Sequence, residues 1–239
     1  MIRNQKVLAV IPARGGSKRI PKKNIINFCG KPLIGWPLSV LKDGNIADEI
    51  IVSTDSEEIA KVAQELGATV PFMRPSELAD DFTGTSAVVK HAVEWYLENI
   101  GPIEYVLTVY PAAVFLSQKD YENAFNILKS SNCQTVFAVS KYSFPIQRAI
   151  YLDEQQNISM FQPENYSTRS QDLVEAYHDA GQFYFSKVSA VLNNSSTFTN
   201  SRMIVLPRYR GVDIDTFEDL ELARRLFMNT SKKDDPKEP

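Results

Sequence analysis

The sequence predicts an α/β fold, in which a mostly parallel sheet is flanked by helices. Short apolar runs with the length of buried strands recur along the 239 residues, and segments with helical spacing follow most of them. Strands and helices in alternation are typical of a parallel sheet. At this length, with 44% hydrophobic and 23% charged residues, we expect a single domain with a substantial core over residues 1–229.

The elements of this fold follow one another along the chain. The first strand covers residues 7–11 and stops at Pro12. The second, at 49–54, precedes a helix for which Ser56 is a typical N-cap and Gly67 a typical stop. Further strands are predicted at 105–110, 135–139, 182–186 and 203–207, and further helices around 31–41, 88–97, 121–129 and 216–227.

The alternation breaks between about residues 140 and 182. Prolines, aromatic residues and polar residues replace the regular pattern there, and two short strands are predicted at 147–152 and 159–162. An inserted excursion of this kind often serves as a substrate lid or a dimer contact. Residues 230–239 are charged and contain proline, so we expect a disordered tail.

Composition excludes several classes of partner. The net charge of −3 argues against nucleic acid as a partner, so the one basic loop described below is a local feature. No apolar run is long enough to span a membrane, and the N-terminus lacks the pattern of a signal peptide. Cys29 and Cys133 lie far apart and show no metal-binding spacing. We therefore expect a cytoplasmic protein with reduced thiols and without a membrane partner.

A basic loop follows the first strand. It surrounds Gly15, Gly16 and Ser17 with five cations, namely Arg14, Lys18, Arg19, Lys22 and Lys23. Adjacent glycines allow a ligand to approach the backbone closely, and the end of a buried strand is where an open α/β sheet usually binds its ligand. Neither the Walker pattern nor the dinucleotide fingerprint is present. The loop therefore predicts a polyphosphate site of another kind.

A pair of acidic residues near the C-terminus complements this loop. Asp213 and Asp215 flank Ile214, so both carboxylates point to one side of an extended segment. Mg²⁺ usually takes one or two carboxylates together with phosphate oxygens. An Asp-x-Asp pattern alone is a weak signal, but cations together with a carboxylate-held metal are what phosphoryl or nucleotidyl transfer requires.

Three segments resemble the CMP-sialic acid synthetase (acylneuraminate cytidylyltransferase) family. Residues 11–24 are similar to its signature loop, residues 74–79 to a segment with a nucleotide-contacting arginine, and residues 212–220 to its metal motif. The resemblance implies a Rossmann-like nucleotidyltransferase fold and a homodimer. It also implies transfer of CMP from CTP to a nine-carbon 2-keto sugar acid, with release of pyrophosphate, for surface glycan or flagellin glycosylation.

The resemblance also implies roles for individual residues. The catalytic set is Arg14, Lys23, Asp213 and Asp215, and the two aspartates hold Mg²⁺. The nucleotide-binding set is Ala13, Arg14, Gly15, Lys18, Lys23, Asn24, Arg74, Thr85 and Ser86. The sugar-binding set is Gln147, Arg148, Tyr177, His178, Gln182 and Phe183. Either Arg148 or Arg169 suits the sugar carboxylate by bidentate geometry, and His178 is a base, a hydrogen-bond donor or a structural residue.

The identity of the acceptor depends on the middle of the chain. Residues 144–149 and 166–184 resemble the branch of the family that uses pseudaminic acid, whereas sialic, legionaminic and 3-deoxy-octulosonic acid are the alternatives. Where sialic acid synthetases carry Gln-Pro-Thr-Ser-Pro, this chain has Tyr-Pro-Ala-Ala-Val from Tyr110 onward. A potential glutamine contact and two hydroxyls are thereby lost, so a non-catalytic anion-binding paralogue is a further alternative.

Overall fold

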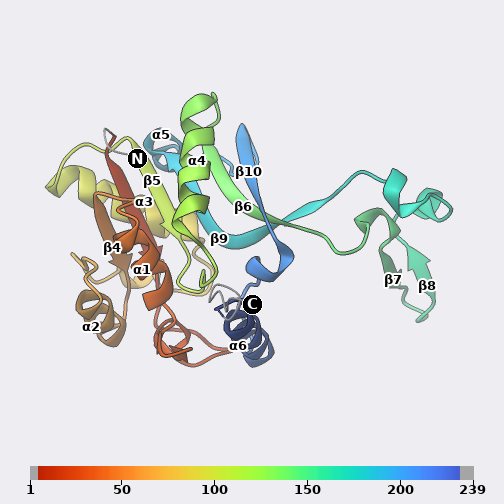
Figure 1. Ribbon diagram of the computed structural model, residues 1–239, viewed down its shortest axis with the longest axis horizontal. Coiled ribbons are helices and arrows are strands. Elements are labelled where there is room, and N and C mark those ends of the chain that lie inside the picture. The colour runs from red at the N-terminus through yellow and green to blue at the C-terminus, as the bar shows by residue number, and fades with distance from the viewer. Residues whose placement is uncertain (1–4, 232–239) are drawn as a thin grey trace, which may run out of the picture.

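The computed structural model describes residues 5–231, which form a six-stranded sheet covered by helices on both faces (Figure 1). The strand order is β10-β6-β9-β5-β1-β4. β9 is antiparallel to both of its neighbours, whereas the other five strands run in one direction. The sheet is therefore mostly parallel, as predicted. Its strands are β1 (Val7–Pro12), β4 (Glu49–Ser53), β5 (Tyr105–Val109), β6 (Thr135–Lys141), β9 (Tyr177–Lys187) and β10 (Ser201–Leu206).

The helices and the smaller strands fill the connections between these strands. The helices are α1 (Gly35–Asp43), α2 (Glu57–Glu65), α3 (Thr85–Asn99), α4 (Gln118–Ser130), α5 (Val188–Leu192) and α6 (Phe217–Ser231). Two separate two-stranded sheets pair β2 (Asn27–Phe28) with β3 (Lys31–Pro32) and β7 (Ile150–Leu152) with β8 (Ile158–Met160).

Strand β1 is buried on both of its faces, which explains its uninterrupted apolar sequence. Val7, Ala9 and Ile11 belong to a core cluster with residues of α1, α2 and α4. Leu8 and Val10 point to the opposite face and pack with α3 and, at its margin, α5. Side chains alternate along a strand, so this one segment contributes to both layers of the core.

A third cluster attaches α6 to the loops at one end of the sheet. Ile214, Leu220 and Ala223 pack with Ile20 and Phe28 and with further residues that follow β1 and β5. The apolar residues of the C-terminal segment thereby lie against the segment that follows the basic loop. This packing brings residues 20–28 and 214–223, which are far apart in the sequence, together near the ends of β1 and β5.

A bulge interrupts the pairing of β9 with β6. Phe137 pairs with Tyr184 and Val139 pairs with Asp179, so residues 180–183 lie opposite a single residue of β6. Gly181 has φ of +59° within this bulge, a left-handed conformation that glycine adopts without the Cβ penalty.

The excursion forms an arm that extends from the sheet between β6 and β9 (Figure 1). It covers residues 142–176 and carries the β7–β8 hairpin at its far end. The predicted bounds of 140–182 are too wide, because Tyr177 pairs with Lys141 and the following residues of β9 continue this pairing. The two arm strands are also shorter than predicted, since residues 146–148 form a 3₁₀ turn.

The predicted helix signals are confirmed where the structure describes them. Ser56 accepts a hydrogen bond from the backbone N–H of Ile59, and Gly67 ends the segment with φ of +83°. Thr216 caps α6 by accepting a bond from the Asp219 N–H at 3.2 Å. Helix α6 continues to Ser231, so the predicted tail begins too early, and residues 232–239 lie outside the described part.

Candidate active site

Among the described residues, five basic side chains line the first cavity, and they come from two segments of the chain. The cavity measures about 430 Å³ and lies at the ends of β1, β4 and β5. Four of its cations follow β1, and the fifth follows β4. They are Arg14, Lys18, Arg19, Lys23 and Arg74. The clustering of like charges at strand ends is the arrangement that the sequence predicted for a polyphosphate.

Two of these cations are tethered to an acidic loop across the cavity. Arg14 Nη1 donates to the backbone oxygen of Asp80 and to Asp81 Oδ1, both at 3.0 Å. Lys18 Nζ forms an ion pair with the other oxygen of the Asp81 carboxylate. Asp80 and Asp81 line the same cavity. The loop thus neutralises part of the positive charge until a stronger anion competes for it.

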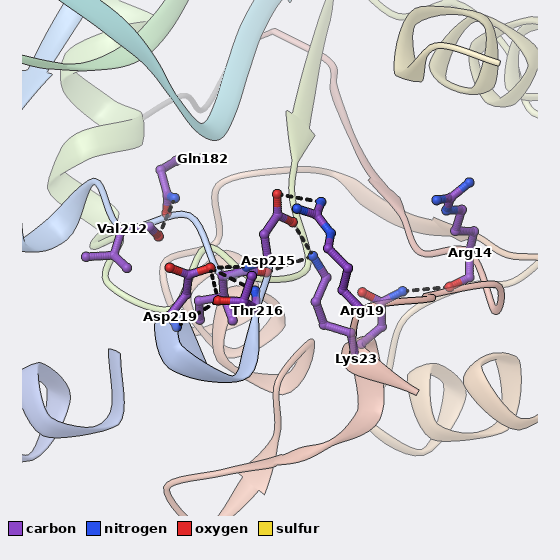
Figure 2. A network of polar contacts seen from close by, with 10 residues as sticks. Arg14, Arg19, Lys23, Gln182, Val212, Asp215, Thr216 and Asp219 are labelled. Atoms are coloured by element: carbon purple, nitrogen blue, oxygen red, sulfur yellow. Dashed lines mark hydrogen bonds and ion pairs between the residues drawn. The ribbon is translucent and has the colours of Figure 1, made fainter. Parts of the chain in front are cut away.

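The Asp215 carboxylate is bridged by two cations of the basic loop (Figure 2). Arg19 Nη2 lies 2.7 Å from Oδ2, and Lys23 Nζ lies 3.1 Å from Oδ1. Lys23 Nζ also donates to the backbone oxygen of Ile214 at 2.8 Å. The loop after β1 and the segment before α6 are therefore joined by charge as well as by apolar packing.

Asp213 has no such ion pair within the described chain, and although the residue as a whole is exposed, the surrounding protein partly desolvates its carboxylate. This desolvation, followed by the neighbouring Asp215 carboxylate, raises the pKa of Asp213, while Lys23 acts in the opposite direction. Two carboxylates that destabilise each other's charge suit a bound cation. The site offers Mg²⁺ two carboxylates and leaves the remaining positions to phosphate oxygens and water, so the residues fit this metal.

The acidic segment is fixed from both sides. Gln182 Nε2, in the β9 bulge, donates to the backbone oxygen of Val212 at 3.2 Å (Figure 2). A Cβ at Gly181 would lie 3.7 Å from Asp213 Oδ2, so the bulge approaches this carboxylate closely. On the other side, Asp219 Oδ2 accepts the N–H groups of Asp215 and Thr216 at 3.1 and 2.8 Å.

Arg74 and Asn24 organise the floor of the cavity. Arg74 is 7% exposed, and its guanidinium donates to the hydroxyl and the backbone oxygen of Ser53 at the end of β4. Asn24 is also buried and donates to the backbone oxygen of Arg14 at 2.9 Å. The Asn24 side chain therefore holds the backbone of the basic loop. Arg74 places a guanidinium group in a fixed position at the cavity.

A second cavity of about 280 Å³ adjoins the first, and Thr85 and Tyr110 line both. Its wall is rich in hydroxyl groups, and Asp179 is its only charged lining residue among those that the structure describes. The hydroxyl residues are Thr85, Ser86, Thr108, Tyr110, Thr135, Tyr184, Ser186, Ser195 and Thr197. This cavity suits a neutral, polar molecule, in contrast to the cationic cavity beside it.

Most residues predicted for the nucleotide line the first cavity, but three do not. Ala13 is fully buried, and its N–H donates to the backbone oxygen of Ser53. The N–H of Gly15 donates to Asp55 Oδ1 at 2.8 Å. Ser86 lines the second cavity instead of the first. The side chain of Ala13 is therefore part of the core and does not contact a ligand.

The residues predicted for the sugar are not brought together. Phe183 is fully buried and packs on Tyr121, so its prediction as a sugar contact is wrong. Gln182 is also buried, and its Oε1 has no hydrogen-bond partner in the described structure. Gln147 and Arg148 lie on the arm, and Arg169 lies further along it.

Tyr177 and His178 begin strand β9 near the base of the arm. Tyr177 donates to Glu175 Oε2 at 2.8 Å. The ring of His178 packs against Tyr142 with centroids 5.0 Å apart. Neither residue lines the two cavities. The two cavities of the single chain therefore do not support the prediction that Tyr177 and His178 contact the sugar.

Several lining residues were missed by the sequence analysis. Arg19 was recognised as part of the basic loop but was not assigned to the site, and Asp80, Asp81 and Tyr184 were not considered. Their positions depend on long-range contacts that leave no local pattern. The difference from sialic acid synthetases at Tyr110 was the one sequence signal for the second cavity, because Tyr110 lies where the two cavities meet.

The fold and the site together define a nucleotide-binding α/β protein equipped for transfer at a polyphosphate. The profile of the Cytidylyltransferase family matches residues 8–233, and the chain belongs to this family. It is thus a CTP-dependent nucleotidyltransferase.

Relatives of the chain carry names for related reactions. It is 43% identical, over 93% of its length and 96% of the relative, to the pseudaminic acid cytidylyltransferase of Campylobacter jejuni. It is 30% identical, over 93% and 96% of the two chains, to the CMP-N,N'-diacetyllegionaminic acid synthase of Legionella pneumophila. A solved CMP:2-keto-3-deoxy-manno-octonic acid synthetase complexed with CTP has the same fold, with a TM-score of 0.69, 17% identity and coverage of 94% and 99%.

The membrane prediction can be compared with the helices that the structure describes. Among residues 5–231, no helix combines the length and the apolar character that crossing a membrane requires. Both cysteines are free thiols, as the sequence analysis predicted.

Proposed function

We propose that this protein transfers CMP from CTP to pseudaminic acid and releases pyrophosphate. The observation that carries the proposal is the meeting of the basic loop with Asp213 and Asp215 at one cavity, next to a second, hydroxyl-rich cavity. The 43% identity to a pseudaminic acid cytidylyltransferase supports the choice of acceptor. A cytoplasmic location suits a CTP-dependent enzyme with two free thiols.

The triphosphate binds in the first cavity. Its oxygens replace the Asp81 carboxylate as partner of Arg14 and Lys18, because a polyphosphate carries more charge than one carboxylate. Arg74 supplies a cation that is already fixed by Ser53, so little ordering is required there. Lys23 lies between the phosphates and Asp215, where it stabilises charge on both.

Asp213 and Asp215 would hold Mg²⁺, which when bound would polarise the phosphate oxygens and offset the negative charge on the leaving pyrophosphate. Asp215 would release its contact with Arg19 in order to hold the metal. Arg19 is then free to turn to the triphosphate. The bulge at Gly181 and the hydrogen bond from Gln182 keep the acidic segment in place during this exchange.

The acceptor binds in the second cavity with its anomeric hydroxyl toward the first. The hydroxyl oxygen forms a bond to the α-phosphorus, and the bond from that phosphorus to the bridging oxygen of the β-phosphate breaks. The proton of the hydroxyl passes to water, because the two aspartates that would hold the metal are not free to act as its base. CMP-sugar and pyrophosphate are the products.

The arm provides the contact for a homodimer. Its exposed apolar side chains include Phe144, Ile158 and Val174, which are 82%, 71% and 80% exposed in the single chain. Exposed apolar side chains at this density mark an interaction surface. A second copy of the same arm would cover them symmetrically.

The proposal is tested by pyrophosphate release from CTP and Mg²⁺ with a panel of acid sugars: pseudaminic, sialic, legionaminic and 3-deoxy-octulosonic acid. We expect the highest kcat/KM with pseudaminic acid. Preference for another member of the panel would refute the assignment of the acceptor. Absence of pyrophosphate with every acid sugar would support a non-catalytic paralogue.

A further inference from the structure

Asp179 occupies an unusual position in the second cavity. It is the only charged residue among those lining this cavity, and no ion pair involves it within residues 5–231. Its carboxylate accepts the N–H of Gly181 at 2.9 Å through Oδ1 and the hydroxyl of Tyr184 through Oδ2. Each carboxylate oxygen has two acceptor sites, so both retain the capacity for a further hydrogen bond.

The carboxylate is held rigidly by its surroundings. Burial, followed by the hydrogen bond to Asp179, raises the pKa of Tyr184, so this hydroxyl remains protonated and donates at any physiological pH. The ring of Tyr184 stacks on Phe137 with an interplanar angle of 21°. A group whose orientation is fixed before the ligand binds loses little entropy on binding.

A row of polar side chains leads from Asp179 to the boundary between the two cavities. The rings of Tyr184 and Tyr110 pack edge to face, with their centroids 6.0 Å apart. Tyr110 in turn bonds to Thr85 Oγ1 at 3.1 Å. Thr85 and Tyr110 line both cavities, so the row runs from the carboxylate to the place where donor and acceptor meet.

We propose that Asp179 determines acceptor specificity by accepting a hydrogen bond from an amide N–H or a hydroxyl of the sugar, at the end remote from the reacting group. The inference rests on the proposed function and names the specificity element of its acceptor cavity. Asp179 also repels the carboxylate of the acid sugar. The sugar therefore binds with its carboxylate toward the five cations of the first cavity and with a neutral donor toward Asp179.

The central variant is Asp179→Asn, which keeps the size of the side chain and an oxygen that can accept from Gly181 or Tyr184, but removes the charge. We expect kcat/KM for the acceptor to fall about 10- to 100-fold, the range for loss of a hydrogen bond to a charged group. The dissociation constant of CTP, measured by calorimetry without acceptor, should stay unchanged, and the melting temperature should fall only slightly because one of the two hydrogen bonds from Gly181 and Tyr184 is lost. The control is Asp43→Asn, at the exposed last residue of α1, which should alter none of these values.

A second measurement does not depend on any variant. Acceptors in which the acylamino nitrogens are methylated, or single hydroxyls replaced by hydrogen, lack one donor each. The unmodified enzyme should discriminate against one of them about 10-fold or more, and Asp179→Asn should lose this discrimination. If the effect of removing a sugar donor on kcat/KM and the effect of Asp179→Asn are not additive, the removed donor is the group that Asp179 recognises.

The results that overturn the inference are distinct from failure of the proposed function. Equal acceptor kcat/KM for Asp179→Asn and the unmodified enzyme, while both transfer CMP, would refute the role of Asp179 alone. A parallel loss of CTP affinity and of melting temperature would show that the residue only supports the bulge. Absence of CMP transfer by the unmodified enzyme would refute the proposed function and, with it, the inference.

Discussion

At the scale of single residues, ion pairs in the candidate site partly neutralise the positive charge of the basic loop. Four of its five cations, all in the loop after β1, contact the carboxylates of Asp81 and Asp215. Most of these side chains are partly exposed, so each pair contributes little stability and can exchange partners readily. The arrangement keeps the basic loop ordered while leaving its charges available to a triphosphate.

Arg19→Ala should increase the affinity of the nucleotide-free enzyme for the metal. Arg19 competes with the metal for Asp215 Oδ2, and its side chain is 64% exposed, so removal should raise affinity only about two- to fivefold, corresponding to about 0.5–1 kcal/mol. Calorimetric titration with Mg²⁺ or Mn²⁺ measures this effect. Arg225→Ala, which removes an exposed arginine paired with Glu221 on α6, is the matched control and should leave it unchanged. Weaker metal binding by Arg19→Ala would contradict the competition.

At the scale of elements, the acidic segment is positioned by α6 and by the bulge of β9. Ile214 is fully buried between the two aspartates and belongs to the cluster that joins α6 to the loops after β1 and β5. The bulge touches the same segment through Gly181 and Gln182. Packing of one apolar side chain thus determines where the two carboxylates lie.

Ile214→Ala should destabilise the protein by about 2–5 kcal/mol, as for other large-to-small changes in a core. It should also weaken metal binding, because the flanking carboxylates lose their anchor. Chemical denaturation measures the first effect and calorimetry the second. Leu222→Ala, at a position on α6 that is 49% exposed, is the control and should lower the free energy of unfolding much less. Unchanged metal affinity in Ile214→Ala would show that the segment is held by its hydrogen bonds alone.

Most elements could be predicted from the sequence because they depend on local patterns. The apolar run of β1, the cap at Ser56 and the stop at Gly67 are local signals, and each is confirmed. The antiparallel insertion of β9 and its bulge depend on pairing with distant strands. The family resemblance assigned Phe183 to the sugar, whereas the structure places its side chain in the core next to the bulge.

The same distinction applies to the candidate site. The basic loop and the acidic pair could be predicted because each lies within a short segment, and the structure brings them together through Lys23 and Asp215. The second cavity could not be predicted, since its wall combines residues from α3, β5, β6, β9 and the segment after α5. Only folding brings these segments to one place.

At the scale of the whole molecule, the two cavities and the arm form three functional regions. In the proposed function, the cationic cavity binds the nucleotide, the hydroxyl-rich cavity binds a neutral part of the acceptor, and the arm contacts a second copy of the chain. The arm extends away from the sheet, so its apolar side chains have few partners in the single chain (Figure 1).

The double variant Phe144→Asp and Val174→Asp should convert a dimer into a monomer. Each introduced charge appears twice in a symmetric dimer. Because these charges would be buried in an apolar contact without water, they should prevent the dimer from forming. Sedimentation velocity or light scattering after gel filtration measures the mass. Ile100→Asp, at an exposed apolar position after α3, is the control and should leave the dimer intact. A monomeric unmodified protein, or a double variant that remains dimeric, would contradict this role of the arm.

The central claim is that the basic loop and the two aspartates transfer CMP from CTP to an acid sugar. The most direct measurement follows α-labelled CTP into product, with pseudaminic acid and Mg²⁺, for the unmodified enzyme and for Asp215→Ala. We predict label in CMP-pseudaminic acid for the unmodified enzyme, and at least a hundredfold slower transfer for a folded Asp215→Ala, as when a group that stabilises transition-state charge is removed. Near-normal transfer by Asp215→Ala, or absence of labelled product from the unmodified enzyme, would contradict the claim.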